Sequence, residues 1–273
     1  METKEQLLAE LSAIQKWEKE QKKVWIWERI SRLPFKVLDR LTPKFIQEKV
    51  GQLLDEIGSF IQTGGQYLIQ EKYVLKRVQE ANPELTILSV KDAGTAPLEK
   101  MAAVSEQLTS SRANLATVQG ATTGVGGIFT LVADIPLLLG LSLKTLQEIA
   151  IIHGYDPHEK EERLFIIKCL QFASSDVVGR QAILDELSAF YEGSKSHDKM
   201  ISQLQGWREV VYTYRDQFGW KKMLQLVPIA GILFGAVTNR SAISDLGEAG
   251  AVLYRKRRLM ERMQAITEQE SSL

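Results

Sequence analysis

The chain has 273 residues, of which 44% are hydrophobic and 25% charged, a composition typical of a globular protein and not of a disordered or fibrous one. Its 34 Lys and Arg residues equal its 34 Asp and Glu residues, so no net charge attracts the chain to a polyanion and we expect no nucleic-acid partner. The single cysteine, Cys169, cannot form an internal disulfide. The charged start METKEQLLAEL does not resemble a signal peptide, and these two features together predict a cytoplasmic location.

Residues 1–40 are predicted to form an N-terminal helical arm. Apolar side chains recur there at helical spacing, at Leu7, Leu11, Ile14 and Trp17. The run VWIWERI follows, and Pro34 ends or kinks the helix before it. A second helix is predicted to open at Thr42 and Pro43, an N-cap residue followed by proline, and to run toward Gly64.

The region from residue 82 to residue 97 reads as a connection, because it combines proline, glycine and β-branched residues. A helix is predicted over about 97–118, and the run GATTGVGG at 120–127 follows it. A central helix is then predicted over 129–153, with Asp134 as an N-cap start signal and Gly154 as the stop. Because its first half is apolar nearly all round, this helix should be buried centrally or lie against lipid.

The remainder of the chain also shows helical patterns. Asp156 and Pro157 are predicted to open the helix EKEERLFIIKCLQFA, in which Cys169 fits a buried apolar position. Further helical segments are expected at about 177–192, 198–217, 224–238 and 245–263. No sustained two-residue alternation occurs, so we predict an all-α fold. It would be one compact multi-helix domain over 41–265, followed by a disordered tail at 266–273.

Several stretches of the chain resemble the EcsC protein family, a bacterial family. They are KWEKE at 16–20, LTPKFIQEKV at 41–50, GATTGVGGIFTLVADIPLLLGLSLKTLQEIAIIHGYDP at 120–157, EERLFIIKCL directly after it, and VPIAGILFGAVTN at 227–239. The family takes its name from a gene beside those of an ABC-type exporter, so the resemblance implies a membrane protein such as a transporter as a possible partner. It implies no catalytic residues.

The glycine run is the candidate ligand loop or hinge. Exposed backbone N–H groups before a helix can bind anions, which makes Gly120, Gly124, Gly126, Gly127 and Asp134 candidates for a hydrolase or ligand-binding site. The run lacks the Lys and Ser/Thr of a P-loop, and close helix packing or a hinge explains it better. Asp134 and Glu148, fourteen residues apart on one helix, lie roughly 20 Å from each other, so they do not form a catalytic carboxylate pair.

A second set of candidates could contact an anionic membrane surface. Tryptophans beside basic residues are typical of interfacial segments, and residues 200–263 carry twice as many basic as acidic side chains. The candidate contacts are Trp25, Trp27, Trp220, Lys221, Lys222, Arg255, Lys256, Arg257 and Arg258. A solvated basic face with tryptophans in the core is the alternative.

The three histidines, His153, His158 and His197, lack metal-ligand spacing with one another and with Cys169, and we expect no metal and no cofactor. The leading hypothesis is a non-enzymatic cytoplasmic or peripheral membrane protein that acts through a partner or a lipid surface. Alternatives are a hydrolase or ligand-binding protein with its site near Gly120 to Asp134, and a membrane-inserted helical hairpin of 129–153 and 224–238. The sequence does not indicate an oligomeric state.

Overall fold

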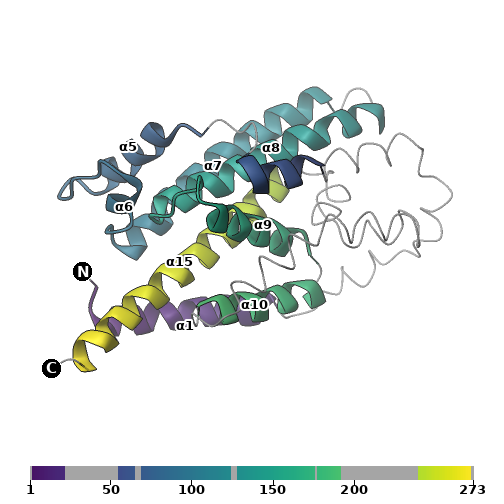
Figure 1. Ribbon diagram of the computed structural model, residues 1–273. Helices are drawn as coiled ribbons and strands as arrows, with labels where there is room; N and C mark the ends of the chain where they lie inside the picture. Colours follow the sequence, from purple (N-terminus) through teal and green to yellow (C-terminus); the bar gives the residue numbers. More distant parts are fainter. Residues whose placement is uncertain are drawn as a thin grey trace.

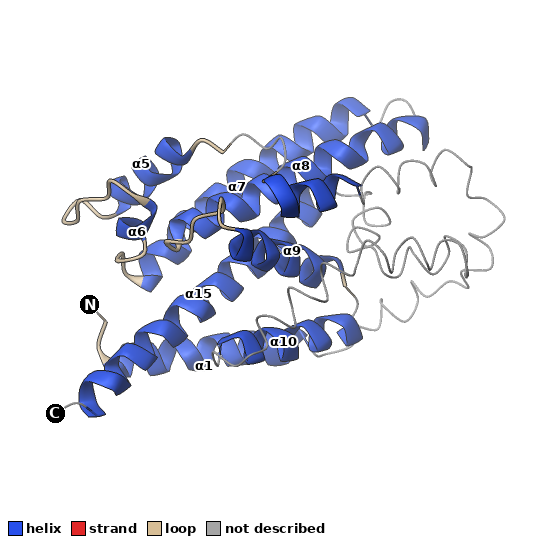
Figure 2. Ribbon diagram, in the orientation of Figure 1, coloured by secondary structure: helices blue, strands red, loops and turns tan. Residues whose placement is uncertain are grey.

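The computed structural model describes residues 2–21, 55–64, 69–123, 128–175, 177–191 and 239–271. Within these ranges the regular structure is entirely helical, and no strand occurs among them (Figure 2). This confirms the all-α prediction. The described helices are α1 (Lys4–Gln21), a helix at 55–63, α5 (Glu71–Ala81), α6 (Val90–Ala93), α7 (Leu98–Thr123), α8 (Ile128–Ile152), α9 (Lys160–Ser174), α10 (Val177–Tyr191) and α15 (Asn239–Ser271).

Two long helices, α7 and α8, run side by side as an antiparallel hairpin, and α15 crosses beneath them (Figure 1). Helices α5 and α6 lie at one end of this hairpin, and α1 and α10 lie on the opposite side of α15. Helix α9 packs against both α8 and α15. Because α15 contacts α1, α7, α8, α9 and α10, it is the element that joins the two sides of the molecule.

The apolar side chains form two adjoining clusters. One is centred on α8, α9 and α15 and includes Leu143, Phe165 and Leu253. The other joins the N-terminal half of α7 to α1, α5 and the second half of α15. From Leu138 to Ile152 the side chains of α8 are almost all buried, so the second half of this helix is protein core, as a central apolar helix requires.

Gly154 ends α8 as the sequence predicts. Its φ is +82°, the left-handed conformation that favours glycine. The Tyr155 N–H donates to the Ala150 carbonyl at 2.9 Å and the Gly154 N–H donates to the Ile151 carbonyl at 2.9 Å, which together form a Schellman motif. A Cβ atom on Gly154 would lie 2.4 Å from the Cα atom of Gly94, so the turn after α8 touches the turn after α6 at backbone distance.

The range predicted for the central helix, 129–153, agrees with α8 to within one residue, but two predicted N-cap residues are wrong. Helix α8 begins at Ile128, so Asp134 lies inside the helix and is not its N-cap. An Asp-Ile-Pro pattern marks a helix start only where the preceding residues cannot be helical, and the apolar run from Ile128 to Ala133 is helical here. Helix α9 begins at Lys160 after a turn in which Asp156 accepts from the His158 N–H, three residues later than the predicted proline start.

Helix α15 is longer than predicted at both ends. It extends through residues 266–271, the first part of the segment predicted as a disordered tail. This last turn and a half is held by the Lys4 to Glu270 ion pair at 2.9 Å and by a Gln264 to Glu268 hydrogen bond. The predicted helix at 198–217 and the apolar segment 224–238 lie outside the described residues.

Helix α1, from the predicted N-terminal arm, packs against α15 and α10 and buries Leu7 and Ile14. The remainder of the predicted arm, residues 22–40, lies outside the described residues. The division into an arm and a main domain stays a prediction. The two buried side chains of α1 belong to the same core as the main domain.

Candidate functional site

The basic run of α15, Arg255 to Arg258, faces other helices of the same chain. Arg255 Nη1 lies 3.5 Å from Glu10 and Lys256 Nζ lies 2.6 Å from Glu18, both on α1. Arg257 Nη1 lies 2.7 Å from Glu162 on α9. Arg258 donates from Nε and Nη2 to the His153 carbonyl, at 2.9 and 2.6 Å. These four candidate membrane-surface residues therefore hold helices together, and a contact with lipid from them stays a prediction.

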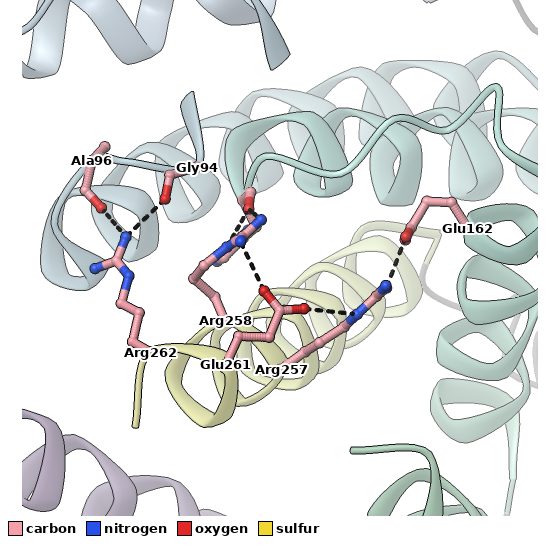
Figure 3. Close-up of polar contacts among 8 residues, drawn as sticks. Gly94, Ala96, Glu162, Arg257, Arg258, Glu261 and Arg262 are labelled. Carbon is pink, nitrogen blue, oxygen red and sulfur yellow. Dashed lines mark hydrogen bonds and ion pairs between the residues drawn. The ribbon is translucent and has the colours of Figure 1, made fainter. Parts of the chain in front are cut away.

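Arg257 and its partners form a buried polar cluster (Figure 3). The Tyr254 hydroxyl donates to Glu162 Oε1, while Arg257 pairs with Oε2 of the same carboxylate. Burial raises the pKa of Glu162, and the Arg257 guanidinium opposes this effect. Arg257 also lies 4.0 Å from the ring centre of Tyr155, with Arg258 at 4.2 Å from the same ring, so one aromatic ring holds two guanidinium groups.

The arginines near the end of α15 cap the ends of other helices. Arg258 binds the carbonyl at the C-terminus of α8, where carbonyls lack helical partners and carry partial negative charge. Arg262 donates to the carbonyls of Gly94 and Ala96, at 2.9 and 2.7 Å (Figure 3). It also donates to the Glu2 carboxylate at 2.5 Å. Sequence reasoning missed this role because backbone carbonyls leave no signal in the sequence.

His153 lies at the centre of this arrangement, fully buried and stacked on the Tyr254 ring at 5.9 Å. Its Nδ1 hydrogen-bonds to the Ile149 carbonyl at 2.9 Å, which requires a proton on Nδ1. Burial lowers the pKa of His153 to about 3, and the nearby positive charges of Arg258 and Arg255 act in the same direction. His153 is therefore a neutral imidazole at physiological pH.

We expect the buried histidine to make the fold acid-sensitive. The unfolded state takes up a proton near the ordinary histidine pKa of ~6.5, whereas folded His153 does not until about pH 3, so stability falls as pH drops through this window. At pH 5 the loss is about 2 kcal/mol relative to pH 7.5. Urea unfolding at both pH values should show this difference in the wild type and in His158→Gln, which alters an exposed histidine, but not in His153→Gln. An equal difference in His153→Gln would contradict the assignment.

Other buried charges are also paired. Glu148 on α8 is fully buried and accepts two hydrogen bonds from Arg112 on α7, at 2.6 and 2.8 Å. Lys168 on α9 lies 2.5 Å from Glu186 on α10. Glu162 on α9 likewise pairs with Arg257 on α15, and Cys169 is buried as its pattern predicts.

The glycine run and the tryptophan candidates are only partly placed. Gly120 lies in the last turn of α7 and Asp134 lies in α8, so the hairpin positions both. Gly124, Gly126 and Gly127 connect the two helices and lie outside the described residues. So do Trp25, Trp27, Trp220, Lys221 and Lys222. A ligand site at the glycine run stays a prediction.

The end of the α7–α8 hairpin, defined here as residues 115–137, is almost free of charge. Asp134 is its one ionisable residue. Two large apolar side chains bound it, Leu115 on α7 at 50% exposure and Leu137 on α8 at 57%. Leu115 lies eight residues before the end of α7 at Thr123, and Leu137 lies nine after the start of α8 at Ile128, so the two occupy the same level of the hairpin.

A cleft of about 340 Å³ lies between α7 and α15. Its lining residues are mostly small or polar: Ala102, Glu106, Thr109, Ser110, Ser244, Gly247, Glu248, Ala251, Val252 and Arg255. Gly120 and Asp134 are not among them. The volume lies in the range of small-molecule pockets, roughly 300–1,000 Å³. Among the candidate residues predicted from the sequence, the cleft includes Arg255.

The described residues include neither a membrane-spanning helix nor a metal-binding cluster. No described helix meets the length and apolarity needed to cross a membrane. No group of three or more His, Cys, Asp or Glu side chains within the described ranges has a metal-binding arrangement.

Comparison with known proteins gives one family. The model of the EcsC protein family matches residues 9–259. The Bacillus subtilis (strain 168) protein named "Uncharacterized protein YdbA" is 57% identical over 269 residues, which cover 98% of each chain. "Protein EcsC" of the same organism is 30% identical over 171 residues, 63% of this chain and 69% of that protein. No solved structure matches the chain.

Proposed function

Since this chain belongs to the EcsC protein family, we propose for it a non-enzymatic role at the cytoplasmic face of a membrane, where the end of the α7–α8 hairpin docks into the lipid surface. The observation that carries the proposal is the contrast in charge along the hairpin. One quarter of the whole chain is charged, whereas residues 115–137 contain Asp134 alone and are bounded by two half-exposed leucines. Such a contrast is typical of segments that contact an apolar phase.

The length of the hairpin end favours shallow insertion over spanning. From Leu115 to the end of α7 the helix rises about 12 Å at 1.5 Å per residue, less than half of the ~30 Å hydrocarbon core of a bilayer. An amphipathic element that lies in the interface buries its apolar face to about 5–10 Å. The second half of α8 is covered by protein, which anchors the docked end to the helical body.

The buried ionisable residues support a structural reading of the helical body. Glu148, Glu162 and Lys168 each have an opposite charge from another helix beside them. Each of these pairs joins two helices, so the charges help to hold together the helical body to which the hairpin end is attached. We therefore assign them no chemistry.

Flotation with lipid vesicles tests the proposal. The full chain should float with vesicles of phosphatidylcholine and phosphatidylglycerol that contain no other protein. The double variant Leu115→Asp and Leu137→Asp should bind at least tenfold more weakly, because two leucines that would each transfer part of their surface to lipid become carboxylates.

The matched control is Leu88→Asp. Leu88 is 80% exposed and lies in the chain between α5 and α6, the two helices at the opposite end of the α7–α8 pair (Figure 1). This variant should float like the wild type, and circular dichroism should show that all variants remain helical. Equal flotation of the double variant and the control would overturn the lipid contact. Binding to native membranes but not to pure lipid would show that the chain binds a membrane protein and not the lipid itself.

A further inference from the structure

Helix α1 is attached along one side of α15 (Figure 1). Most of its contacts are with α15, and fewer are with α10. Of the eighteen residues of α1, Leu7 and Ile14 are buried, and both belong to the apolar cluster that includes Leu259 of α15. The apolar part of the attachment is therefore small for a helix of this length.

Ion pairs make up much of the remaining attachment. Acidic side chains of the N-terminal segment pair with basic side chains of α15 in three places: Glu2 with Arg262 at 2.5 Å, Glu10 with Arg255 at 3.5 Å and Glu18 with Lys256 at 2.6 Å. All six side chains are between 12% and 27% exposed, so water screens these pairs only in part. The N-terminal segment therefore supplies the counter-charge for a basic face of α15.

The face of α15 that α1 covers has apolar and basic side chains in separate bands. Leu259 is buried there, and Met263 and Ile266 pack against the same apolar cluster. At about 100° per residue, these three side chains span an arc of roughly 60° around the helix, with Arg255 near one edge and Lys256 near the other. An apolar band with basic side chains at its edges is typical of a helix that lies in the interface of an anionic membrane.

We propose that this face of α15 is a second lipid-binding surface, specific for an anionic bilayer, and that α1 masks it. Lipid phosphates and the carboxylates of α1 are both anionic oxygen acceptors, so they compete for the same cations. The boundary of the hydrocarbon region can also cover the apolar band in place of Leu7 and Ile14.

The choice of a bilayer as the occupant rests on the proposed membrane role of the chain. It does not rest on the hairpin end, because the covered face of α15 is a different surface of the molecule. The two lipid contacts can therefore be tested separately.

Two double variants of α1 test the masking. Glu10→Gln with Glu18→Gln removes two carboxylates that pair with α15, whereas Glu5→Gln with Glu20→Gln removes two exposed carboxylates from the outer side of the same helix. Both double variants raise the net charge by the same amount, so their general attraction to an anionic surface is equal. The first should bind vesicles of phosphatidylcholine and phosphatidylglycerol roughly tenfold more tightly than the second, because it exposes Arg255 and Lys256. On pure phosphatidylcholine the two should bind equally.

Hydrogen exchange follows the release of α1 directly. In Glu10→Gln with Glu18→Gln, anionic vesicles should speed exchange of the α1 amides while the buried second half of α8 stays protected. Adding Leu115→Asp and Leu137→Asp to both double variants should leave the tenfold difference between them, because these changes affect the hairpin end alone. Failure of the hairpin contact is thereby distinguished from failure of the masking.

Equal binding of anionic vesicles by the two double variants would overturn the proposal, as would α1 amides that stay protected in the vesicle-bound Glu10→Gln with Glu18→Gln. A dimer of that variant without tighter lipid binding would also overturn it, since the exposed face would then bind α1 of a second copy. If the double variant does not fold, Glu18→Gln compared with Glu20→Gln decides by the same measurements.

Discussion

Replacing Arg112 by alanine is expected to lower the free energy of unfolding by about 3–5 kcal/mol. Arg112 on α7 makes two hydrogen bonds to Glu148, whose side chain is fully buried on α8. Removal of the guanidinium leaves a carboxylate in the core without its counter-charge, and the desolvation cost of that group is then no longer offset. Urea unfolding at neutral pH, followed by circular dichroism, measures the change.

An exposed ion pair provides the control for Arg112. Lys76 and Glu80 on α5 lie 3.8 Å apart with both side chains mostly exposed. Lys76→Ala should change the unfolding free energy by less than about 0.5 kcal/mol, because such pairs are screened by water. The double variant Arg112→Leu with Glu148→Leu should recover much of the loss, since it removes both charges together. A small effect of Arg112→Ala would show that Glu148 reaches water.

Gly154→Ala is expected to cost about 3–4 kcal/mol of stability, from two sources that add. The backbone there has φ +82°, which a residue with a Cβ atom adopts at a cost of about 1–2 kcal/mol. The new Cβ would also lie 2.4 Å from the Cα atom and 2.7 Å from the N atom of Gly94, and backbone atoms cannot move aside as a flexible side chain does. Thermal and urea unfolding both report the loss.

Gly58→Ala is the matched change for Gly154. Gly58 lies within the helix at 55–63, and a Cβ atom built there meets nothing within 4 Å. Alanine favours the helix over glycine, so this variant should gain about 0.5–1 kcal/mol. If Gly154→Ala were as stable as the wild type, the contact between the turns after α6 and α8 would have to be looser than the structure has it.

Local signals in the sequence predicted much of the helical fold. Gly154 was a reliable stop because a positive φ leaves few choices of residue, and Cys169 was placed correctly because its neighbours repeat at helical spacing. The N-cap assigned to Asp134 is wrong because Asp134 and Pro136 imitate a helix N-terminus within a run that is already helical. A local pattern shows that a residue can serve as an N-cap, but it does not show whether the helix has already begun at an earlier residue.

The candidate sites depended on contacts between distant parts of the chain, and these the sequence could not predict. Arg255 to Arg258 read as a surface patch, yet their partners lie on α1, α8 and α9, up to about 245 residues away. The cleft required the register between α7 and α15, which depends on Gly247 and Thr109 meeting. The low charge around Asp134 was visible in the sequence, but its place at the end of a hairpin was not.

The position of α15 in the chain has a consequence for biosynthesis. Its partners α1, α7, α8, α9 and α10 all precede it in the chain. During translation each of them therefore emerges from the ribosome before α15, the helix that joins them, has been synthesised. Until then the apolar faces that α15 covers on α7 and α8 stay open to other nascent chains, the circumstance in which large helical proteins aggregate or recruit chaperones. We therefore expect the native state to form only after translation has passed residue 271, in one late, cooperative step.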